Sequence, residues 1–227
     1  MRLDKFICRS TQLDQAQARA TIAAGQVEVN NEIATDPAQQ VHENNHISLA
    51  GQRLTPRPPR YIMLHKPAGY LCSHQDGTYP SIFQWLTLEN AEQLHLVGRL
   101  DADTTGLVLV TDDGRWSYHL THPDNGCSKV YRVTLRNPIS CDTAKQFSQG
   151  LLLQGETHAT LPAQLQIITP TEVLLTLTEG RFHQVKRMFA AVGNKVVALH
   201  REQIGQLQLD IPVGEWRYLT TAEIANN

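Results

Sequence analysis

Residues 97–111 contain the clearest candidate for chemistry, because Asp101 lies between two short apolar stretches that we predict to be strands. Two strands would hold such a carboxylate in place while its loop leaves it open to a substrate. A carboxylate in this setting can act as a nucleophile or as a general base. Aspartate is also common in turns, so on these residues alone a purely structural role for Asp101 stays open.

Asp101 and Asp103 also form a D-x-D pattern, which is similar to that of metal-dependent glycosyltransferases and some nucleases. Mg²⁺ often binds to one or two carboxylates together with substrate phosphates. The pattern is very short, however, and no third carboxylate accompanies it in a matching context. Residues 112–114, Asp-Asp-Gly, are interpreted as a hairpin turn. We therefore predict no metal site.

A basic segment in the second half of the chain is the next candidate. Residues 181–201 contain no acidic residue and five basic ones: Arg181, Lys186, Arg187, Lys195 and Arg201. Helical spacing of apolar residues predicts a helix over residues 182–192 whose core-facing positions are Phe182, Val185, Phe189 and Val192. His183, Lys186 and Arg187 would then share another face and present cations to phosphates. A solvated basic face is the alternative.

The composition is that of a globular protein without a strong overall charge. Hydrophobic residues make up 41% of the 227 residues, charged residues make up 19%, and the formal net charge is -2. This balance argues against non-specific coating of nucleic acid but is compatible with a local basic groove. The four cysteines form no C-x-x-C pair, and no apolar run suits a signal peptide or a membrane span. We expect a soluble, cytoplasmic monomer with reduced thiols.

A proline-rich stretch divides the chain. Residues 53–60 contain three prolines, which neither a helix nor a central strand accommodates, so we predict a stiff linker there. Residues 1–52 are predicted to form a small domain of two helices, the second over residues 14–24, followed by a small sheet with a turn at residues 30–31. Residues 61–227 then form a larger domain of ordinary size.

The larger domain is rich in short strands. We predict strands over residues 60–64, 97–100, 107–111, 129–135, 163–168, 172–178 and 196–200, and helices over residues 140–149 and 182–192. This irregular alternation predicts the α+β class, with a mixed or antiparallel sheet and flanking helices. Tyr131 falls on an alternating strand, where most tyrosines pack in the core or against neighbouring strands.

These segments resemble, in this order, the motifs of the RsuA/RluA family of pseudouridine synthases. The matching segments are Lys66-Pro-x-Gly-Tyr70, Gly98–Asp101 with Asp103–Leu107, Lys129-Val-Tyr131, Glu179–Met188 and Leu199-His-Arg201. Residues 1–52 resemble an S4 RNA-binding domain, with Arg2–Ile7 and Gly25–Asn30 as the matching segments. Within the family, residues 103–116 most resemble the RsuA type, which acts on the 16S ribosomal RNA of the small subunit.

The resemblance implies that the protein isomerises a specific uridine of 16S ribosomal RNA to pseudouridine, with no cofactor. Asp101 would be the essential catalytic carboxylate, either as nucleophile or as the base that removes the C2′ proton. Tyr131 would stack on the flipped uracil, and Lys186 would pair with Asp101 and keep it ionised. Arg99 and Leu199 complete the predicted base-binding site.

RNA contacts are expected on both domains. The candidate phosphate contacts are Arg2, Lys5, Arg9 and Arg19 in the S4-like piece and Arg181, His183 and Arg187 in the larger domain. Three other functions stay open at this point. They are a large-subunit ribosomal RNA pseudouridine synthase of the same family, a non-catalytic RNA-binding module, and a metal-dependent nuclease or transferase built on the D-x-D pattern.

Overall fold

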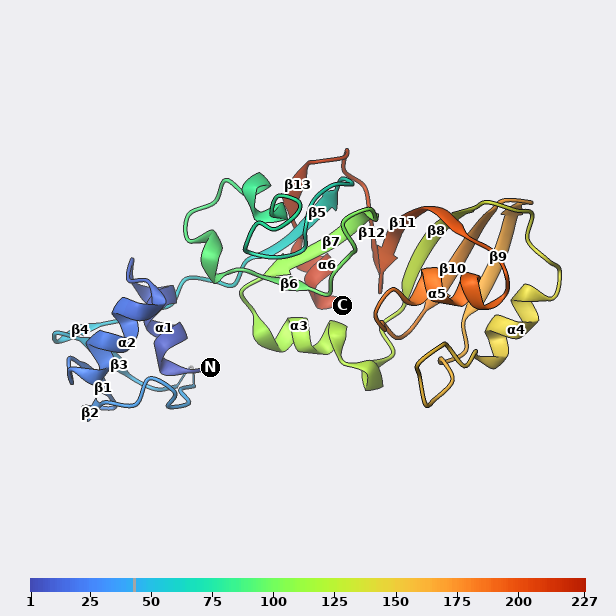
Figure 1. Cartoon of the computed structure of the whole chain (residues 1–227). Coiled ribbons are helices and arrows are strands. Elements are labelled where there is room, and N and C mark those ends of the chain that lie inside the picture. Colours follow the sequence, from blue (N-terminus) through green and yellow to red (C-terminus); the bar gives the residue numbers. More distant parts are fainter. Residues whose placement is uncertain (43) are drawn as a thin grey trace. The chain divides into compact units, whose positions relative to one another are not determined.

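The computed structural model describes residues 1–42 and 44–227, which divide into two compact units, residues 1–58 and 59–227 (Figure 1). Each unit has its own hydrophobic core. The smaller unit carries the segments that resemble an S4 domain, and the larger unit carries the other motifs.

In the small unit, two helices and a four-stranded antiparallel sheet share one core. The helices are α1 (Leu3–Ser10) and α2 (Gln15–Ala23), and the sheet has the order β2 (Glu32–Ala34), β1 (Val27–Val29), β3 (Ile47–Leu49), β4 (Gln52–Arg53). The turn between β1 and β2 is formed by Asn30 and Asn31, whose φ angles of 55° and 68° are typical of a two-residue hairpin. Both the turn and the element order agree with the sequence prediction.

The large unit is built on one sheet of nine strands in the order β13-β5-β7-β11-β8-β10-β9, with β6 paired to β7 and β12 paired to β11. The strands are β5 (Tyr61–Lys66), β6 (His95–Val97), β7 (Thr105–Thr111), β8 (Lys129–Leu135), β9 (Gln164–Thr169), β10 (Glu172–Leu177), β11 (Val196–Ile204), β12 (Leu207–Gln208) and β13 (Trp216–Tyr218). Strands β7 and β11 pair in parallel, whereas neighbours such as β5 and β7 pair antiparallel. The predicted α+β class with a mixed sheet is confirmed.

Helices complete the large unit. They are α3 (Gly114–Thr121), α4 (Thr143–Gln149), α5 (Gln184–Ala191) and α6 (Thr221–Ala225), with 3-10 turns at Ile82–Trp85, Ala91–Gln93 and Pro123–Asn125. In the half of the sheet near β5 and β7, Leu107 and Leu109 pack in one cluster with Trp116 of α3, and Val108 and Val110 pack in another. Burial of β7 on both faces explains its unbroken apolar run.

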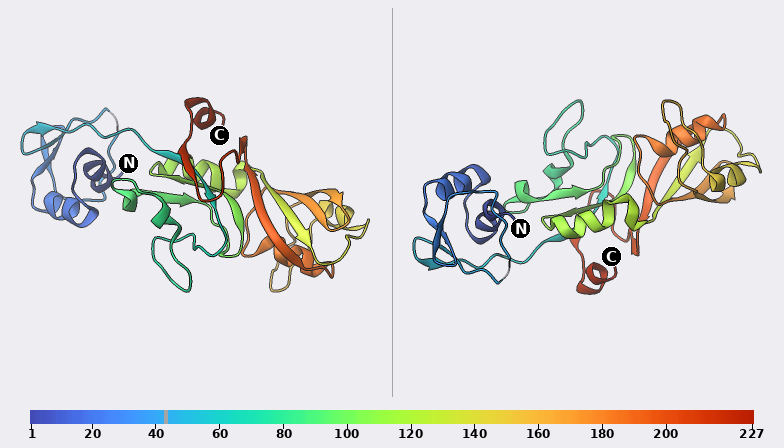
Figure 2. Two further views of the ribbon diagram at one scale, coloured as in Figure 1. Left: turned by 90° about the horizontal axis from the view of Figure 1, so that it is seen from above. Right: turned by 90° about the horizontal axis from the view of Figure 1, so that it is seen from below.

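The other half of the sheet, formed by β8, β10 and β9, is covered on one face by α4 and α5 (Figures 1 and 2). Phe147 of α4 and Phe189 of α5 meet edge to face, with their ring centroids 5.1 Å apart. Both rings belong to one core cluster with Val173 and Leu175 of β10. This packing fixes α5, from which Lys186 reaches the loop before β7.

Three predicted elements differ from the structure. Residues 112–114 form no hairpin turn, because Asp113 caps α3 and its Oδ1 accepts hydrogen bonds from the backbone N–H groups of Arg115 (2.9 Å) and Trp116 (3.3 Å). The strand predicted over residues 97–100 ends at Val97. Helix α5 begins at Gln184, so Phe182 lies before the helix and is 75% exposed instead of facing the core.

The two halves of the sheet join where β7 runs parallel to β11, through the pairs Thr105–His200 and Gly106–Arg201. Gly106 has a φ of +114°, and a Cβ atom on it would lie 2.3 Å from the carbonyl oxygen of Arg201. A residue with a side chain could adopt neither this conformation nor this spacing without strain. Gly106 therefore permits the close approach of β7 and β11 at the point where the Asp101 loop enters β7.

We predict that Gly106→Ala lowers the free energy of unfolding by about 2–5 kcal/mol, because backbone strain and overpacking add. Urea unfolding followed by circular dichroism measures this change. Gly114→Ala is the matched control, because a Cβ atom there meets no heavy atom within 4 Å. We expect this control to change stability by less than about 1 kcal/mol. Equal stability of the two variants would show that the β7–β11 approach does not depend on Gly106.

Candidate active site

Asp101 lies in the loop between β6 and β7, and a buried lysine holds that loop. The Lys66 ammonium at the end of β5 donates hydrogen bonds to the carbonyl oxygens of Pro67 (3.0 Å), Ala102 (3.1 Å) and Thr104 (2.7 Å). Burial lowers the pKa of Lys66, while its three N–H donors find three acceptors. Two of these carbonyls, those of Ala102 and Thr104, follow Asp101 directly in the loop, so Lys66 fixes the path of the loop. The sequence analysis noted Lys66 in a motif without giving it a role.

The structure brings Asp101 and Lys186 together, as the sequence analysis expected. The Lys186 Nζ atom lies 2.9 Å from Asp101 Oδ2 and 2.7 Å from Asp103 Oδ1. Burial disfavours the charged amine, but hydrogen bonds to Asp103 and Asp101 outweigh it and raise the pKa of Lys186. The bond from Lys186 also lowers the pKa of Asp103. His183 contributes a further contact, with its Nε2 3.3 Å from Asp101 Oδ1.

Asp101, His183 and Lys186 line a pocket of about 620 Å³, a size typical of small-ligand sites. Four other residues that the sequence analysis assigned to substrate or RNA binding line it as well: Arg99, Tyr131, Arg181 and Leu199. Tyr131 and Leu199 are buried, whereas Arg99 is exposed. The pocket thus combines a carboxylate, an ammonium and an aromatic ring, a set suited to holding a planar base beside a reactive carboxylate.

The sequence analysis missed two cations in this pocket. Arg201 is buried, its Nε donates to the carbonyl of Leu107 (2.8 Å), and its Nη1 lies 3.5 Å from the hydroxyl of Tyr131. Its Nη2 has no hydrogen-bond partner among the residues that the structure describes. Lys129 donates to the carbonyl of Cys127 (2.9 Å), and burial lowers its pKa. Both residues lie in motifs that the sequence analysis named. The signal that could have identified them is a basic residue on an otherwise apolar strand.

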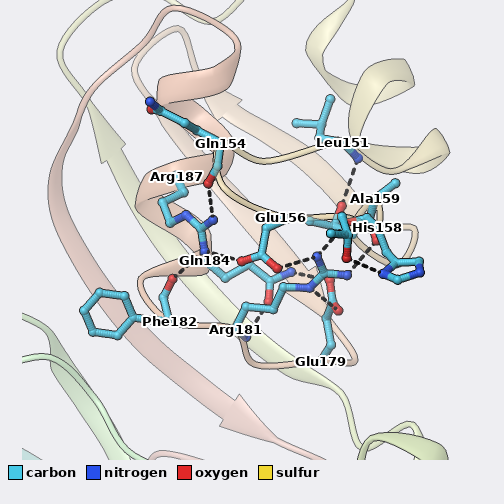
Figure 3. A network of polar contacts seen from close by, with 12 residues as sticks. Leu151, Gln154, Glu156, His158, Ala159, Glu179, Arg181, Phe182, Gln184 and Arg187 are labelled. Atoms are coloured by element: carbon cyan, nitrogen blue, oxygen red, sulfur yellow. Dashed lines mark hydrogen bonds and ion pairs between the residues drawn. The ribbon is translucent and has the colours of Figure 1, made fainter.

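Arg181 and Arg187 belong to a polar network beside the pocket (Figure 3). Arg181 pairs with Glu179 (3.1 Å) and also donates to the carbonyls of residues 158 and 159. Arg187 pairs with Glu156 (2.8 Å) and donates to the carbonyl of Gln154 (2.8 Å). The acids missing from residues 181–201 are thus supplied by neighbouring segments. The RNA-binding role of these two arginines stays a prediction, because their guanidinium groups are already paired.

In the small unit, two of the predicted phosphate contacts share one buried acid. Asp4 accepts hydrogen bonds from Arg2 (2.8 Å) and Arg19 (3.0 Å). Burial would raise the pKa of Asp4, but these hydrogen bonds outweigh it and lower that pKa. Arg9 donates to the carbonyl of Arg57 (2.7 Å), and Lys5 is exposed. The four cations therefore lie in one unit, and their role in RNA binding stays a prediction.

Within residues 1–42 and 44–227, no three His, Cys, Asp or Glu side chains gather as a metal site would require, and the two carboxylates of the D-x-D pattern share the Lys186 ammonium instead. Over the same residues, no helix combines the length and the apolar character that crossing a bilayer demands.

This fold and pocket define a class of protein: the chain belongs to the RNA pseudouridylate synthase family, whose model matches residues 60–191, and it carries an S4 domain at residues 1–47. It is 49% identical over 228 residues to the ribosomal small subunit pseudouridine synthase A of Vibrio cholerae, covering 100% of this chain and 99% of that protein. The Escherichia coli K12 protein of the same name is also 49% identical, over 229 residues.

A solved structure of a pseudouridylate synthase is similar over the whole chain. It shares 45% sequence identity, with a TM-score of 0.74, and the match covers 100% of this chain and 99% of that one. Together with the family matches, this similarity confirms the family expected from the motifs. The protein is therefore a pseudouridine synthase, an isomerase.

We predict that Asp101→Asn abolishes turnover, with a loss of about 10³-fold or more, because an amide has neither the negative charge nor the basicity of a carboxylate. RNA affinity should change less than about threefold, because the amide has nearly the same shape. Asp103→Asn is the matched control: its carboxylate touches the same Lys186 ammonium but is 73% exposed. Single-turnover pseudouridylation compares the two. An active Asp101→Asn beside an inactive Asp103→Asn would assign catalysis to the other carboxylate.

Proposed function

We propose that this protein isomerises a specific uridine of 16S ribosomal RNA, in the small subunit, to pseudouridine. The observation that carries the proposal is the Asp101–Lys186 pair in a pocket beside Tyr131. Relatives aligned over the full chain and named ribosomal small subunit pseudouridine synthase A support the choice of RNA. We further propose that residues 1–52 form an RNA-binding S4 domain, which the linker joins to the larger domain. We also propose that the enzyme acts as a cytoplasmic monomer.

The reaction breaks the bond between N1 of uracil and C1′ of ribose, turns the base, and joins C5 to C1′. The C5 proton passes to solvent, and N1 takes up a proton in its place. The target base must leave its stack and enter the pocket. Tyr131 stacks on the flipped uracil, with Leu199 on the apolar side of the site. Asp101 supplies the carboxylate, as nucleophile toward C1′ or as base at C2′. All atoms of the substrate stay in the product except the exchanged proton, so the chemistry requires no cofactor.

The Lys186 ammonium has two consequences for this chemistry. It places a positive charge 2.9 Å from the Asp101 carboxylate, and this ion pair holds the carboxylate in the pocket. Its second bond, to Asp103, fixes the ammonium from the solvent side. The lysine is thus held by two carboxylates at once. Arg99 is exposed at the same pocket, where its guanidinium group can contact a phosphate of the bound RNA.

The proposal is tested by tritium release from transcripts labelled with [5-³H]uridine. We expect release from small-subunit ribosomal RNA, alone or bound by small-subunit proteins, and none from large-subunit RNA. Release should persist in EDTA, because no step uses a metal ion. Release from large-subunit RNA alone would favour the other substrate, and RNA binding without any release would favour a binding module. Loss of release in EDTA would favour the metal-dependent alternative.

A second prediction concerns the S4 domain. Lys5 is exposed on α1, so Lys5→Ala should remove about one phosphate contact and reduce the slope of log K against log salt by up to about 1. Lys145→Ala on α4 removes an exposed lysine that does not line the pocket, and it should leave the slope unchanged. Filter binding of labelled small-subunit RNA from about 50 to 200 mM salt measures both. Identical slopes for the two variants would place the S4 contacts elsewhere.

A further inference from the structure

Phe182 is an apolar ring left uncovered at the pocket. It is 75% exposed, although it lines the same pocket as Asp101 and Tyr131. In Figure 3 its ring projects away from the polar network that surrounds its backbone. A large exposed aromatic side chain at a binding pocket indicates contact with a partner, because leaving it in water forgoes the stabilisation of burial.

The backbone around Phe182 is held firmly. Its carbonyl accepts a hydrogen bond from Arg187 Nη1 (3.1 Å), and the preceding N–H, of Arg181, donates to Gln184 Oε1 (2.8 Å). The side chain of Gln184 donates in turn to Glu179, and Arg187 and Arg181 both pair with Glu156. These bonds tie the segment before α5 to the segment that contains residues 154–159. An exposed ring on such a base is presented in a fixed place, which lowers the entropy cost of binding.

One face of the Phe182 ring already stacks on His183. The two ring centroids lie 3.7 Å apart with an angle of 22° between the planes. His183 has a left-handed φ of 49°, a conformation that costs energy in a residue with a side chain, and its Nε2 lies 3.3 Å from Asp101. The Phe182 ring is thus stacked on the His183 imidazole, and that imidazole contacts the catalytic carboxylate of Asp101. Its large exposed area leaves a surface open for another planar group.

We infer that Phe182 is a stacking platform for an unpaired RNA base next to the target uridine. This inference rests on the proposed function. Flipping the uridine removes a stacking partner from its neighbours, and an aromatic ring beside the pocket can replace that partner. Stacking on a phenyl ring needs no charge and tolerates any base. It supplies affinity in a protein whose net charge of -2 gives little general attraction to RNA.

The test compares Phe182→Ala, Phe182→Leu and Phe182→Trp on protein-free small-subunit RNA labelled with [5-³H]uridine. Tyr118→Ala is the matched control, because Tyr118 is also exposed (60%), has its ring 4.6 Å from that of His122, and does not line the pocket. We expect Ala and Leu to raise the Kd about tenfold, Trp to keep it within about twofold, and the control to leave it unchanged. Tritium release at saturating enzyme should stay within about threefold of wild type.

Several results would overturn the platform. If Phe182→Ala binds the protein-free RNA as tightly as wild type does, Phe182 is not a platform. If Phe182→Leu binds it as tightly as wild type does, the contact is a general apolar one and not stacking. A loss seen only when ribosomal proteins cover the RNA would make the partner a protein. Failure of the proposed function is separate, because wild type itself would then release no tritium. Thermal unfolding of the variants excludes misfolding as a cause of lost affinity.

Discussion

The site depends on one buried ammonium. Lys66 sits at the end of β5, and its three hydrogen bonds go to carbonyl oxygens, two of them in the loop that carries Asp101. Burying a charge is costly unless every donor is satisfied, so the loop must adopt the one path that presents these carbonyls. The backbone N–H of Gly69 also donates to the Ala102 carbonyl (2.8 Å). These bonds give an irregular loop a defined path.

A residue from a distant part of the chain completes the site around Asp101. Lys186 comes from α5, whose Phe189 belongs to the same core cluster as Val173 and Leu175 of β10. Two carboxylate contacts hold the Lys186 ammonium between Asp101 and Asp103. The approach of the two halves of the sheet sets the distance between the Asp101 loop and Lys186, because Gly106 allows β11 to lie against β7. A change in that spacing would move the Asp101 loop relative to Lys186 and to Tyr131 together.

The sequence predicted what depends on local pattern and motif. Strands such as β7 and β8 follow from their apolar residues, and the Asp101–Lys186 pairing follows from the family resemblance. What failed depended on tertiary context. Asp113 suits both a hairpin turn and a helix cap, and only the burial of Trp116 decides for the cap.

Spacing also could not locate the start of α5. The apolar positions 182, 185 and 189 fit one helical face, yet His183 adopts a left-handed conformation and turns the chain before Gln184. Glu156, which pairs with both Arg181 and Arg187, lies 25 and 31 residues from them along the chain. Long-range pairs of this kind leave no trace in a single sequence, because the separation along the chain gives no spatial information.

The pairing of the basic residues has a consequence for RNA recognition. Several arginines form ion pairs with nearby carboxylates: Arg2, Arg19, Arg181 and Arg187. These pairs order the protein but leave less positive potential to attract phosphates. Under the proposed function, affinity then comes in larger part from short-range contacts at the pocket, where shape and stacking select an unpaired base. Such contacts are nearly insensitive to salt, whereas phosphate contacts weaken with it. On this proposal the protein gains selectivity for one unstacked uridine and has less general attraction to RNA.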